Sequence, residues 1–251
     1  MSRPTLREAL REGPFTLAMS SGFFGFFAHC GVLSVLEDEG LVPARASGSS
    51  AGALVTGAWA AGLDAETLAR TLEGLRREDF WDPAPGFGLL EGGLFRGRLE
   101  ALLPRRSFAE ARVPLTVSAF DVRARATRVL STGDIAAAVH ASCAVPGMFH
   151  PVRVDGRWLL DGGVKDRPGL QGVPAGERVL FHHLSSRSPW RSTRAMEVPR
   201  RPGLVALVID DLPRVGPYRL AEGPRALAAS RAAVRRALDA PVQGGMVRLS
   251  A

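Results

Sequence analysis

The chain has 251 residues and a net charge of +7, a length that suits one large α/β domain with a well-buried core. Lys165 is the only lysine, and the arginines are scattered instead of forming a basic block with interleaved aromatic residues, which argues against a nucleic-acid-binding protein. Cys30 and Cys143 do not make a disulfide framework, and no uninterrupted apolar run reaches membrane-spanning length.

Apolar runs bounded by turn residues alternate with helix-like stretches in the first third of the chain. We expect a strand at 15–20, a helix at 26–40, a strand at 42–48, a helix at 50–62 and a helix at 65–78 that is capped by Asp64. This repetition of strand and helix predicts an α/β fold with a mostly parallel central sheet.

Residues 80–93, "FWDPAPGFGLLEGG", interrupt this alternation with two prolines, four glycines and several large apolar side chains. An apolar loop of this kind is either a long connection packed on the core or a flap over an apolar site. The sequence favours neither interpretation over the other.

The rest of the chain continues the α/β pattern and contains one clear hairpin. The expected elements are a helix at 94–103, strands at 114–120 and 126–131, a helix at 133–142 that is begun by Asp134, strands at 178–184 and 203–210 on either side of an arginine- and serine-rich segment, and a helix at 224–240. Asp155 and Gly156 form the two-residue turn of the hairpin in "VRVDGRWLLDGG". No repeat or boundary divides the chain, so we expect a single domain over residues 1–251.

The pattern G-x-S-x-G occurs once, as "GSSAG", where the second expected strand meets a helix. A nucleophilic serine on such a sharp turn adopts strained backbone angles, and side chains two positions away would clash with the flanking elements. Gly48 and Gly52 therefore suit a turn that presents Ser50. The helix that begins after Ser50 also directs its amide dipoles at the site, where they favour an oxyanion.

A second glycine turn, in "SSGFFGFFAHCGVL", lies between the first expected strand and helix. Gly22 and Gly25 allow successive backbone N–H groups to point at one anion, as a phosphate or an oxyanion requires. The endings of a phosphate-binding loop and the spacing of a dinucleotide-binding fingerprint are both absent. An oxyanion loop and a simple tight turn remain as alternatives.

Together these blocks resemble the bacterial patatin-like phospholipase family. "SSGFFGFFAHCGVL" is similar to its oxyanion loop, "GSSAG" to its nucleophile elbow and "LDGG" to its Asp-Gly-Gly/Ala motif. "ASCAVPGMFHPV" is similar to the segment that precedes the Asp motif. The motifs lie within about residues 15–164, and the C-terminal part completes the sheet and helices. The resemblance implies a patatin-type three-layer α/β/α sandwich and a Ser–Asp dyad. Its residues would be Ser50 and Asp161, followed by Gly162 and Gly163 of the Asp motif.

The chain departs from the family pattern in its glycine-rich loop. The family's G-G-G-x-R/K-G has Ser20 and Ser21 in place of two glycines and Phe24 in place of the cation, and the loop is one residue further from His29 than usual. An oxyanion hole made of backbone amides needs no particular side chains, so these substitutions still allow one to form. The four phenylalanines nearby indicate an apolar environment for an acyl chain.

Two kinds of base could activate Ser50. A carboxylate within hydrogen-bond reach can take the proton directly, and Asp161 stands at the end of the expected hairpin strand. Alternatively, His182 or His183 would complete a triad in the order Ser, Asp, His. Adjacent histidines on opposite faces of a strand interior are poorly placed for this, and His150 is a weaker candidate near the hairpin. His29 and His140 fall on expected helices and suit packing roles.

The sequence therefore predicts a serine hydrolase that cleaves acyl esters of lipids through an acyl-enzyme, with the amides of Gly22, Phe23 and Ala51 as the oxyanion hole. We expect no metal or organic cofactor, a cytoplasmic location and transient contact with an anionic membrane surface, since basic residues are attracted to anionic lipids. The non-enzymatic alternative is a lipid-binding or scaffolding protein on the same fold, inactivated by the altered loop.

Overall fold

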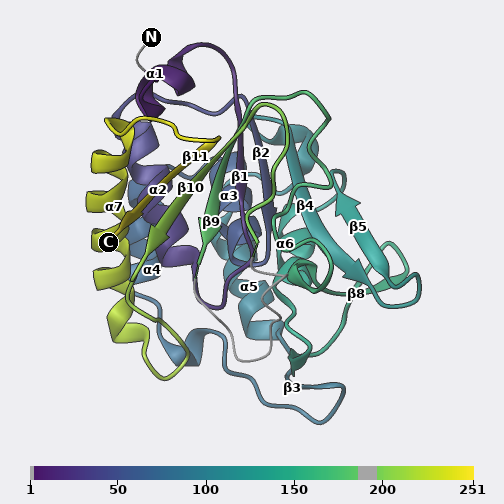
Figure 1. Ribbon diagram of the computed structural model, residues 1–251. Helices are drawn as coiled ribbons and strands as arrows, with labels where there is room; N and C mark the ends of the chain where they lie inside the picture. Colours follow the sequence, from purple (N-terminus) through teal and green to yellow (C-terminus); the bar gives the residue numbers. More distant parts are fainter. Residues whose placement is uncertain (1–2, 186–196) are drawn as a thin grey trace.

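A mostly parallel β-sheet forms the centre of the computed structural model, which describes residues 3–185 and 197–251 (Figure 1). Within these residues one nine-stranded sheet has the order β11-β10-β9-β1-β2-β4-β8-β7, with β5 also paired to β4. The strands are β1 (Thr16–Met19), β2 (Arg45–Ser49), β4 (Leu115–Asp121), β5 (Ala126–Leu130), β7 (Val152–Val154), β8 (Arg157–Asp161), β9 (Val179–Leu184), β10 (Leu204–Asp210) and β11 (Met246–Ser250). Neighbours from β11 to β4 are parallel, whereas β4–β5, β4–β8 and β7–β8 are antiparallel. The predicted α/β class with a mostly parallel sheet is confirmed.

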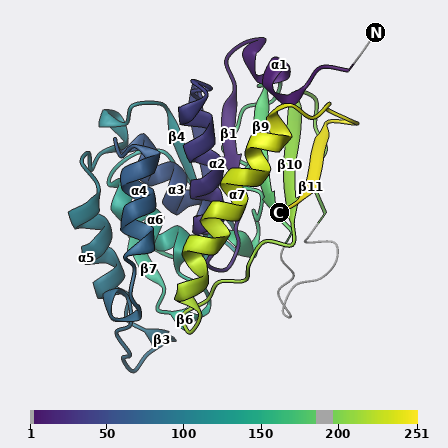
Figure 2. The same cartoon turned by 90° about the vertical axis from the view of Figure 1, so that its left-hand side faces the viewer.

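The helices gather on one face of this sheet, where α2, α4 and α7 lie side by side (Figure 2). The helices are α1 (Leu6–Arg11), α2 (Phe26–Asp38), α3 (Ala51–Ala60), α4 (Ala65–Glu73), α5 (Gly93–Leu102), α6 (Ile135–Cys143) and α7 (Gly223–Leu238). In residues 3–185 and 197–251, none of them combines the length and the apolar character needed to cross a bilayer.

Strand β1 is buried on both sides, and its alternating side chains enter two different clusters. Leu17 and Met19 join the large core beneath the helices. Because successive side chains of a strand point to opposite faces, Ala18 faces the other side, where it packs with Phe181 of β9 and with Val173 from the segment that follows β8. Both faces of the central strands are therefore covered.

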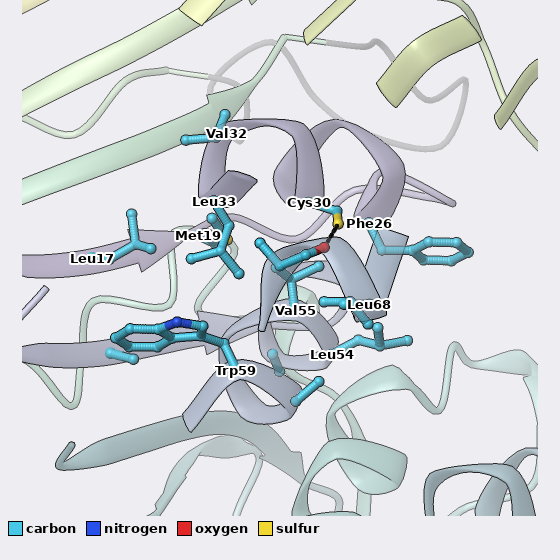
Figure 3. Close-up of a cluster of buried hydrophobic side chains, with 14 of the residues drawn as sticks. Leu17, Met19, Phe26, Cys30, Val32, Leu33, Leu54, Val55, Trp59 and Leu68 are labelled. Atoms are coloured by element: carbon cyan, nitrogen blue, oxygen red, sulfur yellow. Dashed lines mark hydrogen bonds between the residues drawn. The ribbon is translucent and has the colours of Figure 1, made fainter. Parts of the chain in front are cut away.

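The large core lies between β1 and the helices α2, α3 and α4 (Figure 3). Trp59 of α3 is 1% exposed, and its indole N–H donates to a carboxylate oxygen of Glu37 over 2.7 Å. The other oxygen of Glu37 accepts from the backbone N–H of Ala65 at the start of α4. Burying a large apolar side chain stabilises the fold by about 1.5–3 kcal/mol. Through Glu37 of α2, Trp59 also links α3 to the start of α4, and its buried indole N–H has an acceptor.

The local turn and cap predictions are confirmed by the structure. The Asp64 carboxylate accepts from the third amide of α4, and the Asp134 carboxylate does the same for α6. Asp155 and Gly156 both have positive φ, 48° and 75°, as a type I′ hairpin turn requires. The helix expected over 65–78 is shorter, because it ends before Gly74.

Four short or peripheral elements were not predicted: α1, β11, and the strands β3 (Gly88–Leu90) and β6 (Gly147–Phe149), which pair with each other. The three-residue strands β3 and β6 are too short for a periodic pattern to identify them, and α1 makes fewer than two helical turns. Most of the arginine- and serine-rich segment between β9 and β10 lies outside the described residues.

Candidate active site

Ser50 occupies a strained turn between β2 and α3. Its φ of 53° and ψ of −119° lie in a region that non-glycine residues rarely adopt, at a cost of order 1–3 kcal/mol. The Ser50 N–H donates to the hydroxyl of Ser142 over 2.8 Å, and that hydroxyl donates to the Ser118 carbonyl over 2.6 Å. The strained conformation is thus held by a buried hydrogen-bond chain that ends on β4.

Glycines are sterically required on either side of Ser50. A Cβ atom at Gly48 would lie 2.5 Å from the backbone nitrogen of Ala53 in α3, and one at Gly52 would overlap the Met19 carbonyl of β1. Cβ atoms in proteins essentially never make contacts under 3.0 Å, so any side chain would push the helix away from the sheet. The turn can therefore form only with the small residues that the sequence supplies.

Strand β4 brings Asp161 next to Ser50. In its first half β4 pairs with β2, with Ser49 opposite Ser118, and in its second half it pairs with β8, with Asp161 opposite Ala119. Strand β5 occupies the other edge of β4 along both halves, so β2 and β8 lie end to end along one edge. The last residue of β8 consequently meets the turn that ends β2.

The Ser50 hydroxyl donates to Oδ2 of Asp161 over 2.6 Å. The other carboxylate oxygen accepts from the Gly163 N–H over 2.7 Å, which fixes the plane of the carboxylate and aims Oδ2 at Ser50. Both side chains are buried, since Ser50 is 7% and Asp161 4% exposed. The structure thus places the two residues predicted from the sequence in direct contact.

The two glycines after Asp161 allow close approach to neighbouring backbone. A Cβ at Gly162 would overlap the Ser118 carbonyl, and one at Gly163 would overlap the Ser21 side chain. The Asp-Gly-Gly sequence therefore lets the end of β8 lie directly against β4 and against the glycine-rich loop.

The glycine-rich loop, residues 20–25, joins β1 to α2 beside this pair. Gly22 and Gly25 both lie against the Leu184 side chain, and Phe24 has a φ of 54°. The N–H groups of Gly22 and Phe23 donate to no acceptor among residues 3–185 and 197–251. Ala51 opens α3, where amides of the first turn have no acceptor within the helix. These are the three amides that the sequence analysis assigned to an oxyanion hole.

Hydrogen bonds at Ser20 and Ser21 anchor this loop. Ser20 uses its hydroxyl, whereas Ser21 uses the backbone N–H, which a glycine would also supply. The Ser20 hydroxyl accepts from the Leu184 N–H over 3.0 Å, and the Ser21 N–H donates to the Arg167 carbonyl over 2.7 Å. The altered loop is therefore fastened to the end of β9 and to the segment after β8.

A cavity of about 2200 Å³ opens at Ser50 and Asp161. Much of its wall is apolar, with contributions from Phe23, Phe24, Leu54, Phe80, Trp81, Leu99, Met148 and Phe149. Gly22, Phe23 and Ala51 line the same cavity as Ser50 and Asp161, so the residues assigned to the oxyanion hole border the same space as the nucleophile and the carboxylate.

Loop 80–93 combines the two roles that the sequence left open. Phe80 and Leu90 are buried, whereas Phe87 is 89% exposed. Phe80, Trp81 and Leu89 also line the cavity. One part of the loop packs on the core, and another forms a wall of the site.

The chain has five histidines, and none of them lines this cavity. His29 and His182 contact each other, His183 accepts from the Arg167 guanidinium, and His150 lies against backbone carbonyls of loop 80–93. The geometry therefore favours Asp161 over a histidine as the partner of Ser50. In the described part of the chain, no three His, Cys, Asp or Glu side chains gather where they could hold a metal ion.

Sequence reasoning missed the neighbours that hold Ser50 in place. The Cys143 thiol donates to the Ser50 carbonyl over 3.2 Å, next to Ser142 in α6. Burial, with the nearby charge of Asp161 as a smaller cause, raises the pKa of Cys143 well above its ordinary value, so it stays a thiol. Ser142 and Cys143 both lie in "ASCAVPG", part of a block that resembles the family. That resemblance was the sequence signal that could have identified them as neighbours of the site.

Comparisons with known proteins identify a family and a shared fold. The family model described as patatin-like phospholipase matches residues 17–173. An uncharacterized NTE family protein of Mycobacterium tuberculosis is 31% identical over 162 residues, 60% of this chain and 42% of that protein. A second one is 32% identical over 170 residues, 63% of this chain and 27% of that protein. The chain thus spans less than half the length of these relatives. VipD from Legionella pneumophila shares the fold, with a TM-score of 0.66 at 15% identity over 90% of this chain and 67% of VipD.

Proposed function

Because the chain belongs to the patatin-like phospholipase family, we propose that it is a serine acyl hydrolase that cleaves lipid esters with Ser50 as nucleophile and Asp161 as base. The observation that carries this proposal is the 2.6 Å hydrogen bond from the Ser50 hydroxyl to Asp161. It lies on a strained turn at the wall of a largely apolar cavity, which is where an ester with a long acyl chain would bind.

The reaction would proceed in two halves. Ser50 Oγ attacks the ester carbonyl while Asp161 accepts its proton, and the resulting tetrahedral oxyanion is stabilised by backbone amides. When the carbon–oxygen bond of the ester breaks, the leaving alkoxide takes the proton from Asp161 and departs as an alcohol. Asp161 then removes a proton from the water that attacks the acyl-enzyme. When the bond from the acyl carbon to Ser50 Oγ breaks, Ser50 Oγ takes this proton from Asp161, so the acid leaves and both residues return to their starting states.

A carboxylate is a much weaker base than the alkoxide that serine forms when it loses its proton, so the dyad depends on its surroundings. The Gly163 amide holds one oxygen of Asp161 and leaves the other for the Ser50 proton. The amides of Gly22, Phe23 and Ala51 would stabilise the charge that develops on the substrate oxygen, and such preorganised donors are the largest single contribution in many enzymes. The dyad and the oxyanion hole must therefore act together.

A fluorophosphonate probe tests the nucleophile directly, because it forms a covalent bond only with an activated serine. We expect labelling of the wild type and none of Ser50→Ala. Ser49→Ala is the matched control: Ser49 is the preceding residue, is fully buried and does not line the cavity, so this variant should label normally. A panel of esters then defines the acyl length and the headgroup.

A folded wild type that neither labels nor hydrolyses any ester of the panel would refute the proposal. It would instead support the lipid-binding or scaffolding alternative on the same fold.

A further inference from the structure

Two buried histidines join α2 to β9 directly behind the glycine-rich loop. His29 and His182 have no exposed surface, and their Nδ1 atoms are 2.7 Å apart, with the rings edge to face. Nε2 of His29 is 2.8 Å from the carbonyl oxygen of Ser20, the first residue of that loop. Neither histidine lines the cavity, so neither reaches a substrate.

The hydrogen-bond chain has only one consistent direction. A carbonyl oxygen can only accept, so Nε2 of His29 carries the proton and donates to Ser20. Desolvation lowers the pKa of His29 to about 3 and also lowers that of His182, so both rings are neutral. Nδ1 of His29 is then an acceptor, and Nδ1–H of His182 donates to it.

His29 also holds the other end of the loop. Its backbone N–H donates to the Gly25 carbonyl over 3.1 Å, while its ring binds the Ser20 carbonyl. The segment between these anchors contains Gly22 and Phe23, which line the cavity and whose N–H groups have no acceptor in residues 3–185 and 197–251. The backbone bond belongs to the first turn of α2 and any residue at this position would make it, so the ring of His29 is what adds a fixed point at the start of the six-residue loop. His182 in turn fixes this ring.

Two apolar side chains would fill the same space at a smaller desolvation cost than two imidazoles. Burying a polar group away from water is unfavourable unless hydrogen bonds compensate for the loss of water. Nε2 of His182 illustrates this, since it is a buried acceptor with no hydrogen-bond partner in residues 3–185 and 197–251. The hydrogen bond that this arrangement secures is the one to Ser20, which points to a role in the loop.

We propose that His29, oriented by His182, is a positioning residue that clamps the loop of residues 20–25 so that its amides stand ready for the oxyanion. This inference rests on the proposed hydrolase function. It assigns His29 no proton transfer with the substrate.

The test compares two substitutions at one position. His29→Leu removes the ring donor and keeps an apolar side chain, whereas His29→Gln retains an N–H group near the place of Nε2. Removing one oxyanion-hole donor typically lowers kcat by about 10²–10³-fold, and a displaced donor costs less. We expect His29→Leu to lower kcat about 10–100-fold on a soluble short-chain ester, with KM changed less than about twofold, and His29→Gln to restore kcat to within about threefold of wild type.

His140→Leu is the matched control, because His140 is a buried helix histidine that does not line the cavity. It should leave kcat unchanged, and thermal melts check that every variant is folded. A folded His29→Leu with wild-type kcat, or a His29→Gln as impaired as His29→Leu, would overturn the clamp.

Nitrogen-15 NMR of the imidazoles in Ser50→Ala gives a readout that needs neither activity nor a His29 variant. We expect the Nε2–H tautomer at His29 and the Nδ1–H tautomer at His182. The opposite tautomer at His29 would overturn the clamp, because Ser20 would lose its donor. Failure of the hydrolase proposal is recognised separately, by a wild type that neither labels nor hydrolyses esters.

Discussion

Replacing Asp161 by asparagine removes the proposed base and leaves the geometry of the site nearly intact. The asparagine carbonyl can accept from the Gly163 N–H as the carboxylate does, which turns the amide NH₂ toward Ser50. That group can donate to the Ser50 oxygen but cannot take its proton. General-base catalysis contributes about 10²–10⁴-fold, so kcat/KM should fall by this factor, equivalent to about 2.7–5.5 kcal/mol of transition-state stabilisation.

The assay is kcat/KM on a chromogenic ester, with thermal melts as the folding control. Asp166→Asn is the matched substitution: Asp166 is 4% exposed, accepts from the Ser118 hydroxyl over 2.6 Å and does not line the cavity. Its variant should lose stability more than rate, because its carboxylate also accepts from two backbone amides of the following turn. A folded Asp161→Asn enzyme of near-normal rate would falsify the dyad, and a folded but inactive His150→Gln or His183→Gln enzyme would replace it with a triad.

Three further predictions concern the cavity wall formed by loop 80–93, the turn at Ser50 and the buried Cys30. Trp81→Ala with Phe87→Ala should weaken turnover of long-chain esters more than of short-chain esters, and equal losses on both in a kinetic comparison would contradict a role of loop 80–93 in acyl binding. Gly52→Ala should lower the free energy of unfolding by about 1–3 kcal/mol or more through overpacking, whereas Gly97→Ala, which has open space around it, should not; denaturant titrations that show equal stabilities would refute the steric argument. Cys30, whose pKa burial raises to about 12, should resist iodoacetamide at pH 8 in the native protein and react after unfolding, as mass spectrometry can measure.

The local sequence was sufficient to predict those features of the fold that depend only on residues adjacent in the chain. The caps at Asp64 and Asp134 and the hairpin turn at Asp155 require only a short polar side chain or a positive φ at one position. Residues 48–52 were interpretable for the same reason, because the turn itself excludes side chains at Gly48 and Gly52.

The contacts that complete the site could not be predicted in this way, because they join distant parts of the chain. Ser142 supports Ser50 across 92 residues, and His29 meets His182 across 153. No periodicity or spacing specifies such pairs. The sequence assigned His29 to a helix and His182 to a strand interior, which argued against both as mobile bases but left a triad open. Their shared hydrogen bond depends on the order of the strands in the sheet.

The contact between Ser50 and Asp161 depends on the register of β8 against β4. Because strand side chains alternate between faces, a shift of one residue would turn Asp161 to the opposite face of the sheet, away from Ser50. Gly162 opposes such a shift, since its backbone lies where only a residue without a side chain fits against the Ser118 carbonyl. The same carbonyl accepts from Ser142, which in turn holds the Ser50 amide. The position of the base and the strained turn of the nucleophile are therefore fixed from one point on β4, so a change that displaces Ser118 should disturb both partners of the dyad together.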